Sequence, residues 1–280
     1  MADPQTRKPS EMVHRPLSSR KYDYGHLLVV GGSKYYAGAP LLNALAAYIA
    51  GVDVVTIAAP HRAADIAVSH SPDIIAYPLS GDVLGTEHLQ EINSIIKRNV
   101  TAVLIGGGMG REKKSFDFVV ELYNAHKNLP FILDADALHC ASRVDFSSKD
   151  LLIPNIKEFG LISSSDTPTQ VSVKTTAFSI KSNLLVKGPV DYVSDGKRVK
   201  EIKDASGKAV YLAKGGTGDI LAGVCASLIA QGLTPFDAAC IGAAAVKHAG
   251  AALGKLHGPF YLPTDLLRVL PDSLVHELGK

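Results

Sequence analysis

The sequence lacks the features of several large protein classes. It has no tryptophan and only three cysteines, Cys140, Cys225 and Cys240, none of them in a CxxC or metal-ligand spacing. This odd, scattered set argues against a disulfide framework and favours a reducing, cytoplasmic location. No stretch approaches the roughly 20 apolar residues of a membrane span. The N-terminus carries charges and prolines instead of an apolar signal core, so we expect neither a membrane anchor nor a targeting segment.

A charge bias of one sign is also missing. Lys and Arg number 29 against 27 Asp and Glu, a net charge of +2 without a long basic run, so nucleic acid is not an expected partner. The one basic concentration, residues 7–21, is mixed with proline and serine, and we expect residues 1–20 to form a mobile arm. The ten histidines are scattered without the close pairing of a zinc site, and we interpret them as surface or internally satisfied side chains.

Apolar residues, in contrast, are abundant. They make up 46% of the 280 residues, enough for a packed core. Short β-like runs lie at residues 27–30, 54–58, 102–105, 131–133, 151–153 and 184–186. Helical patterns lie at residues 40–50, 116–125, 219–230 and 235–253, with a last helix opened by Pro263 and Thr264. This alternation predicts an α/β fold with a mostly parallel central sheet and helices on both faces, in a single domain over residues 21–280. An Asp-Gly turn within residues 190–202 predicts a small antiparallel hairpin.

The segment with the richest chemistry is Gly215-Gly216-Thr217-Gly218-Asp219, directly before an apolar helix. Small residues there leave the first backbone N–H groups open, and together with the positive end of the helix dipole these donors suit a phosphate. Asp219, just inside the helix, could take a proton from a nearby hydroxyl as general base. A helix cap after a tight turn is the structural alternative.

Two more glycine turns, Gly31-Gly32-Ser33 and Gly106–Gly110, also follow apolar strands. In open parallel sheets, ligands bind outside the C-terminal strand ends, so these turns predict a shared cleft. Asp134 and Asp136 follow the next strand, where they could hold magnesium or a water, or cap the loop.

Polar residues also end the last two parallel strands. Asn155 and Glu158 share one helix face and could order a hydrated magnesium ion beside phosphates. A capping box explains the same pair. Lys187 ends its strand, where its ammonium could reach phosphate oxygens or lie in solvent.

The ordered motifs resemble those of the ADP/ATP-dependent NAD(P)H-hydrate dehydratases, in the ribokinase-like superfamily. The resemblance runs from about Tyr24 to Leu270. It is carried by Gly31-Gly32-Ser33 with Tyr36, Gly38 and Ala39, by Asp134-Ala135-Asp136-Ala137-Leu138, and by the Gly215–Asp219 segment running into Gln231-Gly232. It implies a ribokinase-like fold and a lyase that restores the hydrated cofactor, S-NADHX or S-NADPHX, to NADH or NADPH. Magnesium and ADP or ATP would take part, releasing phosphate and AMP or ADP.

Residue roles follow from the same resemblance. Asp219 would be the catalytic base, Glu158 would contact magnesium through water, and the substrate would be bound by Ala39, Gly108, Asn155 and Asp219. The nucleotide would be bound by Lys187, Gly188, Pro189, Val190, Asp191, Gly216, Thr217 and Gly218. Two positions depart from the family pattern: Asn155 stands where these enzymes usually carry His, and Lys208 follows Gly207 where they commonly have Asn.

The resemblance also bears on partners. These dehydratases are often fused to an epimerase, which this chain is too short to hold, so we expect a separate epimerase; we also expect a homo-oligomer, with a tetramer favoured. Two other functions stay open: a small-molecule kinase resembling hydroxyethylthiazole kinase, because phosphoryl transfer needs the same groups, and a nucleotide-sensing protein without catalysis. The sequence leaves open ADP versus ATP and the NADH versus NADPH hydrate.

Overall fold

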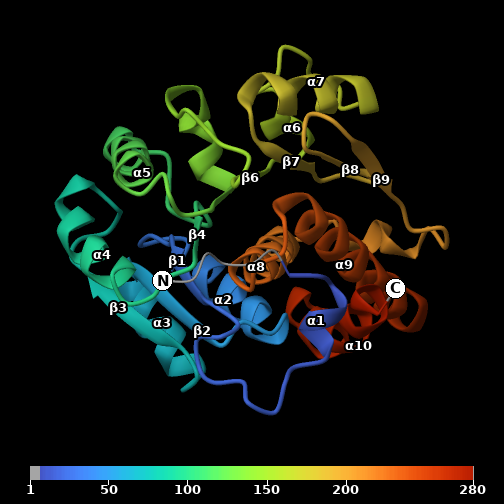
Figure 1. Cartoon of the computed structure of the whole chain (residues 1–280), viewed down its shortest axis with the longest axis horizontal. Coiled ribbons are helices and arrows are strands. Elements are labelled where there is room, and N and C mark those ends of the chain that lie inside the picture. The colour runs from blue at the N-terminus through green and yellow to red at the C-terminus, as the bar shows by residue number, and fades with distance from the viewer. Residues whose placement is uncertain (1–6, 280) are drawn as a thin grey trace.

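A nine-stranded sheet forms the centre of the computed structural model, which describes residues 7–279 (Figure 1). The strand order is β3-β2-β1-β4-β5-β6-β7-β8-β9. The strands are β1 (His26–Val30), β2 (Val54–Pro60), β3 (Ile75–Leu79), β4 (Ala102–Ile105), β5 (Phe131–Asp134), β6 (Leu151–Ile153), β7 (Asn183–Val186), β8 (Asp191–Ser194) and β9 (Val199–Ile202). Strands β1 to β7 are parallel, whereas β8 and β9 add to the edge as antiparallel strands.

Helices cover both faces of this sheet. They are α1 (Ser10–Val13), α2 (Ala39–Ile49), α3 (His61–His70), α4 (Leu89–Ile96), α5 (Lys113–Ala125), α6 (Ile156–Phe159), α7 (Gln170–Ile180), α8 (Thr217–Ala230), α9 (Pro235–His257) and α10 (Leu266–Leu278). Successive side chains of a strand point to opposite faces. Leu27 and Val29 therefore join a core with α2, α3, α8, α9 and α10, while Leu28 and Val30 join one with α4, α5 and α7. The predicted α/β architecture and the hairpin are confirmed.

The sequence analysis did not predict one strand and several helices of the structure. The edge strand β3 is short, contains Pro78 and is partly exposed, so it lacks the apolar run that marks the buried strands. Helix α7 contains four serine or threonine residues within QVSVKTTAFSI and is followed by an αL residue, Lys181, and α3 and α4 were also missed. In these helices the apolar contacts that stabilise the fold come from distant parts of the chain.

The segment before β1 contacts the body of the protein from Arg7 onward. The Arg7 and Arg15 guanidinium groups lie 4.1 Å and 3.8 Å from the centre of the Tyr24 ring, and Arg15 pairs with Asp53 at 3.0 Å. Residues 1–6 of the predicted arm lie outside the described residues, and the mobility of the arm and the domain limits stay predictions. Within residues 7–279, no helix combines the length and apolar character needed to cross a membrane.

Helices α2 and α8 approach each other closely at Gly223. A β-carbon there would lie 2.3 Å from the backbone oxygen of Asn43, closer than any real contact. Helix α8 is buried from Ile220 to its end. The glycine thus permits the packing that fixes the start of α8 against α2 and the sheet.

We predict that Gly223→Ala lowers the free energy of unfolding by about 1–3 kcal/mol, because the added methyl group meets rigid backbone. Urea denaturation measures the difference. Gly215→Ala is the control, since a β-carbon at Gly215 meets no atom within 4 Å, and its effect should stay within about 0.5 kcal/mol. Equal stabilities of the two variants would contradict the packing argument.

Candidate active site

The glycine turns and polar strand ends meet at one edge of the sheet, because β1, β4, β5, β6 and β7 run in the same direction. A cleft of about 640 Å³ opens there between the end of β7, the start of α8 and the middle of α9. Its wall consists of Asn155, Lys187, Gly188, Pro189, Asp191, Asp204, Gly207, Ala209, Val210, Leu212, Ala213, Lys214, Thr217, Gly218, Leu221, Ala243, Val246 and Lys247.

A buried ion pair joins two of the strand ends. The ammonium of Lys187, after β7, lies 2.5 Å from Oδ1 of Asp134 at the end of β5, and the two side chains are only 18% and 3% exposed. Burial alone would lower the pKa of Lys187, but Asp134, with Glu158 and Asp219, raises it above its ordinary value. Lys187 therefore stays charged and points into the site rather than into solvent.

The start of α8 offers open backbone donors. Gly216, with φ of 99°, turns the chain into the helix. The Thr217 hydroxyl donates to the carbonyl oxygens of Leu212 and Lys214, at 2.7 and 2.9 Å, so it caps the preceding turn.

The next two N–H groups, of Gly218 and Asp219, find no acceptor within residues 7–279. A β-carbon on Gly218 would lie 3.3 Å from Nζ of Lys187, which shows that the ammonium reaches this helix start. Two N–H groups, a helix dipole and an ammonium together suit a phosphate.

The Asp219 carboxylate faces the glycine turn after β4. A β-carbon on Gly107 would lie 3.0 Å from Oδ1 of Asp219 and 2.9 Å from Oδ1 of Asn43. Asn43 also donates from Nδ2 to the Asp219 carbonyl oxygen at 2.8 Å. Loss of solvent raises the pKa of Asp219 to about 7, with Asp134 adding to the rise and Lys187 opposing it. A carboxylate with this pKa is matched to general base catalysis near neutral pH.

Ala39 and Gly108 lie next to this carboxylate. A β-carbon on Gly108 would be 3.3 Å from the Ala39 Cβ and 2.9 Å from the Tyr36 Cβ, and Gly108 has a φ of 67°, so a side chain is disfavoured there. The two predicted substrate contacts therefore sit together beside Asp219, and their role stays a prediction.

The acidic and amide groups near the cleft have local partners. Asn155 Oδ1 accepts from the N–H groups of Lys157 and Glu158, and Glu158 Oε2 accepts from the Asn155 N–H, all at 2.9 Å, which is a capping box. Asp136 accepts from the Gly110 N–H at 3.0 Å and pairs with Arg111. Capping therefore accounts for the geometry of both sites, although Asn155 also lines the cleft.

Most of the predicted nucleotide contacts line the cleft. Lys187, Gly188, Pro189, Asp191, Thr217 and Gly218 belong to its wall, whereas Val190 and Gly216 do not. Asp191 is buried, and its Oδ1 accepts from the Gly188 N–H at 2.8 Å.

Sequence reasoning missed Asn43 and Lys247. Lys247, on α9, is 7% exposed; its Nζ donates to the Gly188 carbonyl at 3.0 Å and pairs with Asp191 at 3.2 Å. Burial raises the pKa of Asp191, with Lys247 opposing the rise. A lone lysine inside a long apolar helix was the available signal, because a buried ammonium requires a partner. Asn43 gave a similar signal in α2.

Comparison with known proteins assigns the family. The family described as NAD(P)H-hydrate dehydratase matches residues 27–272. The bifunctional NAD(P)H-hydrate repair enzyme of Pyrobaculum aerophilum is 37% identical over 264 residues, which cover 92% of this chain and 52% of that protein. The ADP-dependent (S)-NAD(P)H-hydrate dehydratase of Cenarchaeum symbiosum is 31% identical over 93% of this chain and 92% of that protein. The chain thus spans about half the length of the bifunctional relative.

Solved structures support the fold. A ribokinase-like superfamily protein from Enterococcus faecalis superposes with a TM-score of 0.82 at 21% identity, over 96% of this chain and 93% of that one. The ADP/ATP-dependent NAD(P)H-hydrate dehydratase of Bacillus subtilis, co-crystallised with ATP and Mg²⁺, gives 0.74 at 21% identity, over 94% of each chain. The fold is therefore ribokinase-like, and by its sequence match the chain belongs to the NAD(P)H-hydrate dehydratase family.

Proposed function

We propose that this protein removes water from S-NADHX or S-NADPHX and returns NADH or NADPH, using ADP or ATP. The observation that carries the proposal is the convergence of three groups at the start of α8. The Asp219 carboxylate, with a pKa of about 7, lies beside two open N–H groups and the Lys187 ammonium. Family membership supports the substrate.

The cleft suits an adenine nucleotide. Its volume of about 640 Å³ lies within the range of small-molecule sites, and Leu212, Leu221 and Val246 give it an apolar wall. We place the base and ribose against this wall and the phosphates at the start of α8. The hydrated nicotinamide ring would then lie on the other side of Asp219, against Ala39 and Gly108.

The chemistry follows from this placement. Asp219 takes the proton from the ring hydroxyl while that oxygen attacks the terminal phosphorus, and the bond from phosphorus to the bridging oxygen breaks to release AMP or ADP. The N–H groups of Gly218 and Asp219, with Lys187, stabilise the negative charge on the transferred group. Phosphate then leaves the ring with the electron pair of the C–O bond, and loss of a ring proton restores the double bond.

Magnesium fits this site as a hydrated ion and not in a cage of protein ligands. Asp134 and Asp136 are already paired with Lys187 and Arg111, and Glu158 accepts a hydrogen bond with Oε2. Mg²⁺ usually keeps several waters and binds substrate phosphates. Glu158 would hold it through water, and the ion would neutralise phosphate charge.

The remaining expectations belong to the same proposal. We propose a cytoplasmic homo-oligomer, with a tetramer favoured, that works with a separate epimerase. Leu256, Phe260 and Leu262 are 74%, 88% and 67% exposed near the end of α9, and such apolar side chains support a subunit contact.

The direct test is repair of hydrated NADH. We expect the reduced-nicotinamide absorbance to recover when the protein is incubated with NADH hydrate, Mg²⁺ and either ADP or ATP; the better nucleotide identifies the donor. Parallel assays with NADPH hydrate give the substrate preference.

Asn155, typical of kinases at this position, favours the rival small-molecule kinase. If the absorbance does not recover with either nucleotide and the protein phosphorylates a thiazole alcohol, the kinase function would be established instead.

Asp219→Asn should lower kcat by at least about 100-fold while nucleotide binding persists, because the amide cannot accept the proton. In the wild type, kcat/KM should rise with pH and level off above about 7, where Asp219 is ionised. Steady-state kinetics from pH 5 to 9 and nucleotide titration by calorimetry measure these effects. If Asp219→Asn kept the wild-type kcat, Asp219 could not be the general base.

The stability of the Asp219→Asn variant tests the raised pKa of Asp219 independently of activity. The pKa of Asp219 is about 7 in the folded protein against an ordinary 3.8, so its protonation favours the folded state below pH 3.8, and this contribution is lost as the pH rises to about 7. The amide that replaces the carboxyl group in Asp219→Asn does not titrate. The stability of this variant relative to wild type should therefore increase by up to about 3 kcal/mol from pH 5 to pH 8 in urea denaturation. If the stability difference between the variant and wild type stayed the same from pH 5 to pH 8, the pKa of Asp219 would not be raised in the folded protein.

Lys187→Met should weaken nucleotide binding by at least about 10-fold, since it removes a charge-assisted contact to phosphate. Removing the ammonium alone also leaves Asp134 buried without its partner. The double variant Asp134→Asn/Lys187→Met separates the two effects and should still bind poorly. Lys174→Met, at an exposed position of α7, is the matched control. Calorimetric titration with ADP and ATP measures the affinity of each variant. Unchanged nucleotide affinity in the double variant would show that Lys187 does not contact the nucleotide.

A further inference from the structure

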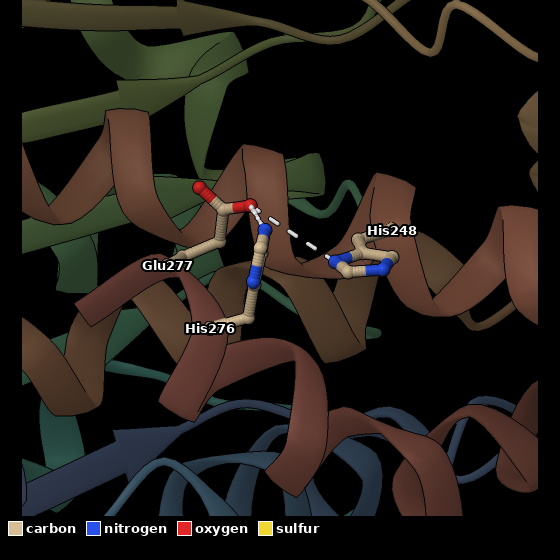
Figure 2. Close-up of side chains that lie close together, drawn as sticks. All are labelled: His248, His276 and Glu277. Carbon is tan, nitrogen blue, oxygen red and sulfur yellow. Dashed lines mark ion pairs between the residues drawn. The ribbon is translucent and has the colours of Figure 1, made fainter. Parts of the chain in front are cut away.

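A second group of chemically active side chains lies outside the cleft, between α9 and α10. Figure 2 shows His248 from α9 and His276 and Glu277 from α10, with the carboxylate directed between the two imidazole rings. Oε1 of Glu277 lies 4.0 Å from Nδ1 of His248 and 3.8 Å from Nε2 of His276. The three potential ligand atoms all lie within 4.8 Å of one another. The fold thus brings His248 next to two consecutive residues that lie far from it in the sequence, His276 and Glu277.

The core packing of the two helices holds this group in place. Val246 and Ala249 of α9 and Leu274 and Leu278 of α10 belong to the same apolar core. The polar side chains remain at the rim, where the imidazoles of His248 and His276 are 48% and 55% exposed and the Glu277 carboxylate is 13% exposed. Their backbones are therefore fixed, and the two imidazole rings pack edge to face with their centres 5.0 Å apart.

Two imidazoles and a carboxylate are a ligand set for a zinc-like ion. Ligand bonds of about 2.0–2.1 Å in tetrahedral geometry place the ligand atoms roughly 3.4 Å apart. The separations of 3.8 and 4.0 Å from Glu277 exceed this by about half an ångström, and all three ligand atoms lie within 4.8 Å of one another, so the half-exposed rings would rotate to bind an ion.

Space for a fourth ligand lies next to two of the three side chains, His248 and Glu277. A hollow of about 370 Å³ has His248 and Glu277 on its wall, together with the charged residues Lys200, Glu201, Lys203, Asp204 and Lys247. Open zinc sites combine three protein ligands with a water. The hollow can hold that water.

We propose that His248, His276 and Glu277 form a binding site for one divalent transition-metal ion of the zinc class, which bridges α9 and α10. The site goes beyond the proposed dehydration and shares no ligand with it. Magnesium is a poor occupant, because it prefers oxygen ligands. The bound ion would connect the last helix to the long helix α9.

Metal titration of the whole chain, freed of any histidine tag, tests the site. We expect one Zn²⁺ to bind per chain by calorimetry in the presence of excess Mg²⁺. Co²⁺ should bind at the same stoichiometry and give visible absorption bands of four-coordinate geometry. The melting temperature should rise with Zn²⁺, because the ion binds the folded state. Absence of one-to-one binding would overturn the proposal.

Matched variants locate the ligands. His248→Ala and His276→Ala should each weaken Zn²⁺ binding by at least about 10-fold, the loss that even outer-shell partners cause. His257→Ala changes an exposed histidine on the same helix and should bind like wild type. Glu277→Gln, which keeps the side-chain size, should also weaken binding. Circular dichroism checks that each variant is folded. Unchanged affinity in both His248→Ala and His276→Ala, or an equal loss in His257→Ala, would refute the assignment.

Discussion

The buried pair of Lys187 and Asp134 is the interaction on which the site depends. The Lys187 ammonium pairs directly with Asp134, at 2.5 Å. Asp219 receives only a weaker share of that charge, and Asp134 repels its ionised form. Burial and the neighbouring Asp134 outweigh the attraction of Lys187, so Asp219 has a pKa of about 7 and is close to half-protonated at neutral pH. Parallel strands are what make this possible, because they bring residues 134 and 187 to the same edge of the sheet.

The features that local sequence determines could be predicted. Apolar runs identified the buried strands, and glycines before an apolar helix located the start of α8. What the sequence could not show depends on tertiary packing. Asn43 reaches Asp219 only because Gly223 lets α2 approach α8. His248 and His276 looked like unrelated surface residues, since nothing local indicates that α9 and α10 pack together.

Asn155 illustrates how one position can serve structure and chemistry. The sequence resemblance predicts histidine there, but asparagine is among the best helix caps, and Asn155 caps α6 with Glu158. The same side chain lines the cleft. A change of residue at this point thus preserves the start of α6 while it alters the hydrogen-bonding surface presented to a ligand.

The open end of α8 has a consequence for product release. Its two N–H groups and the nearby ammonium recognise charge and size, and these are common to many tetrahedral oxyanions. Inorganic phosphate, or sulfate from a buffer, can satisfy the same donors as the phosphates of a nucleotide. In the proposed reaction, the phosphate product would therefore also compete for the site that released it, and the choice of salt would change how much of the protein is vacant.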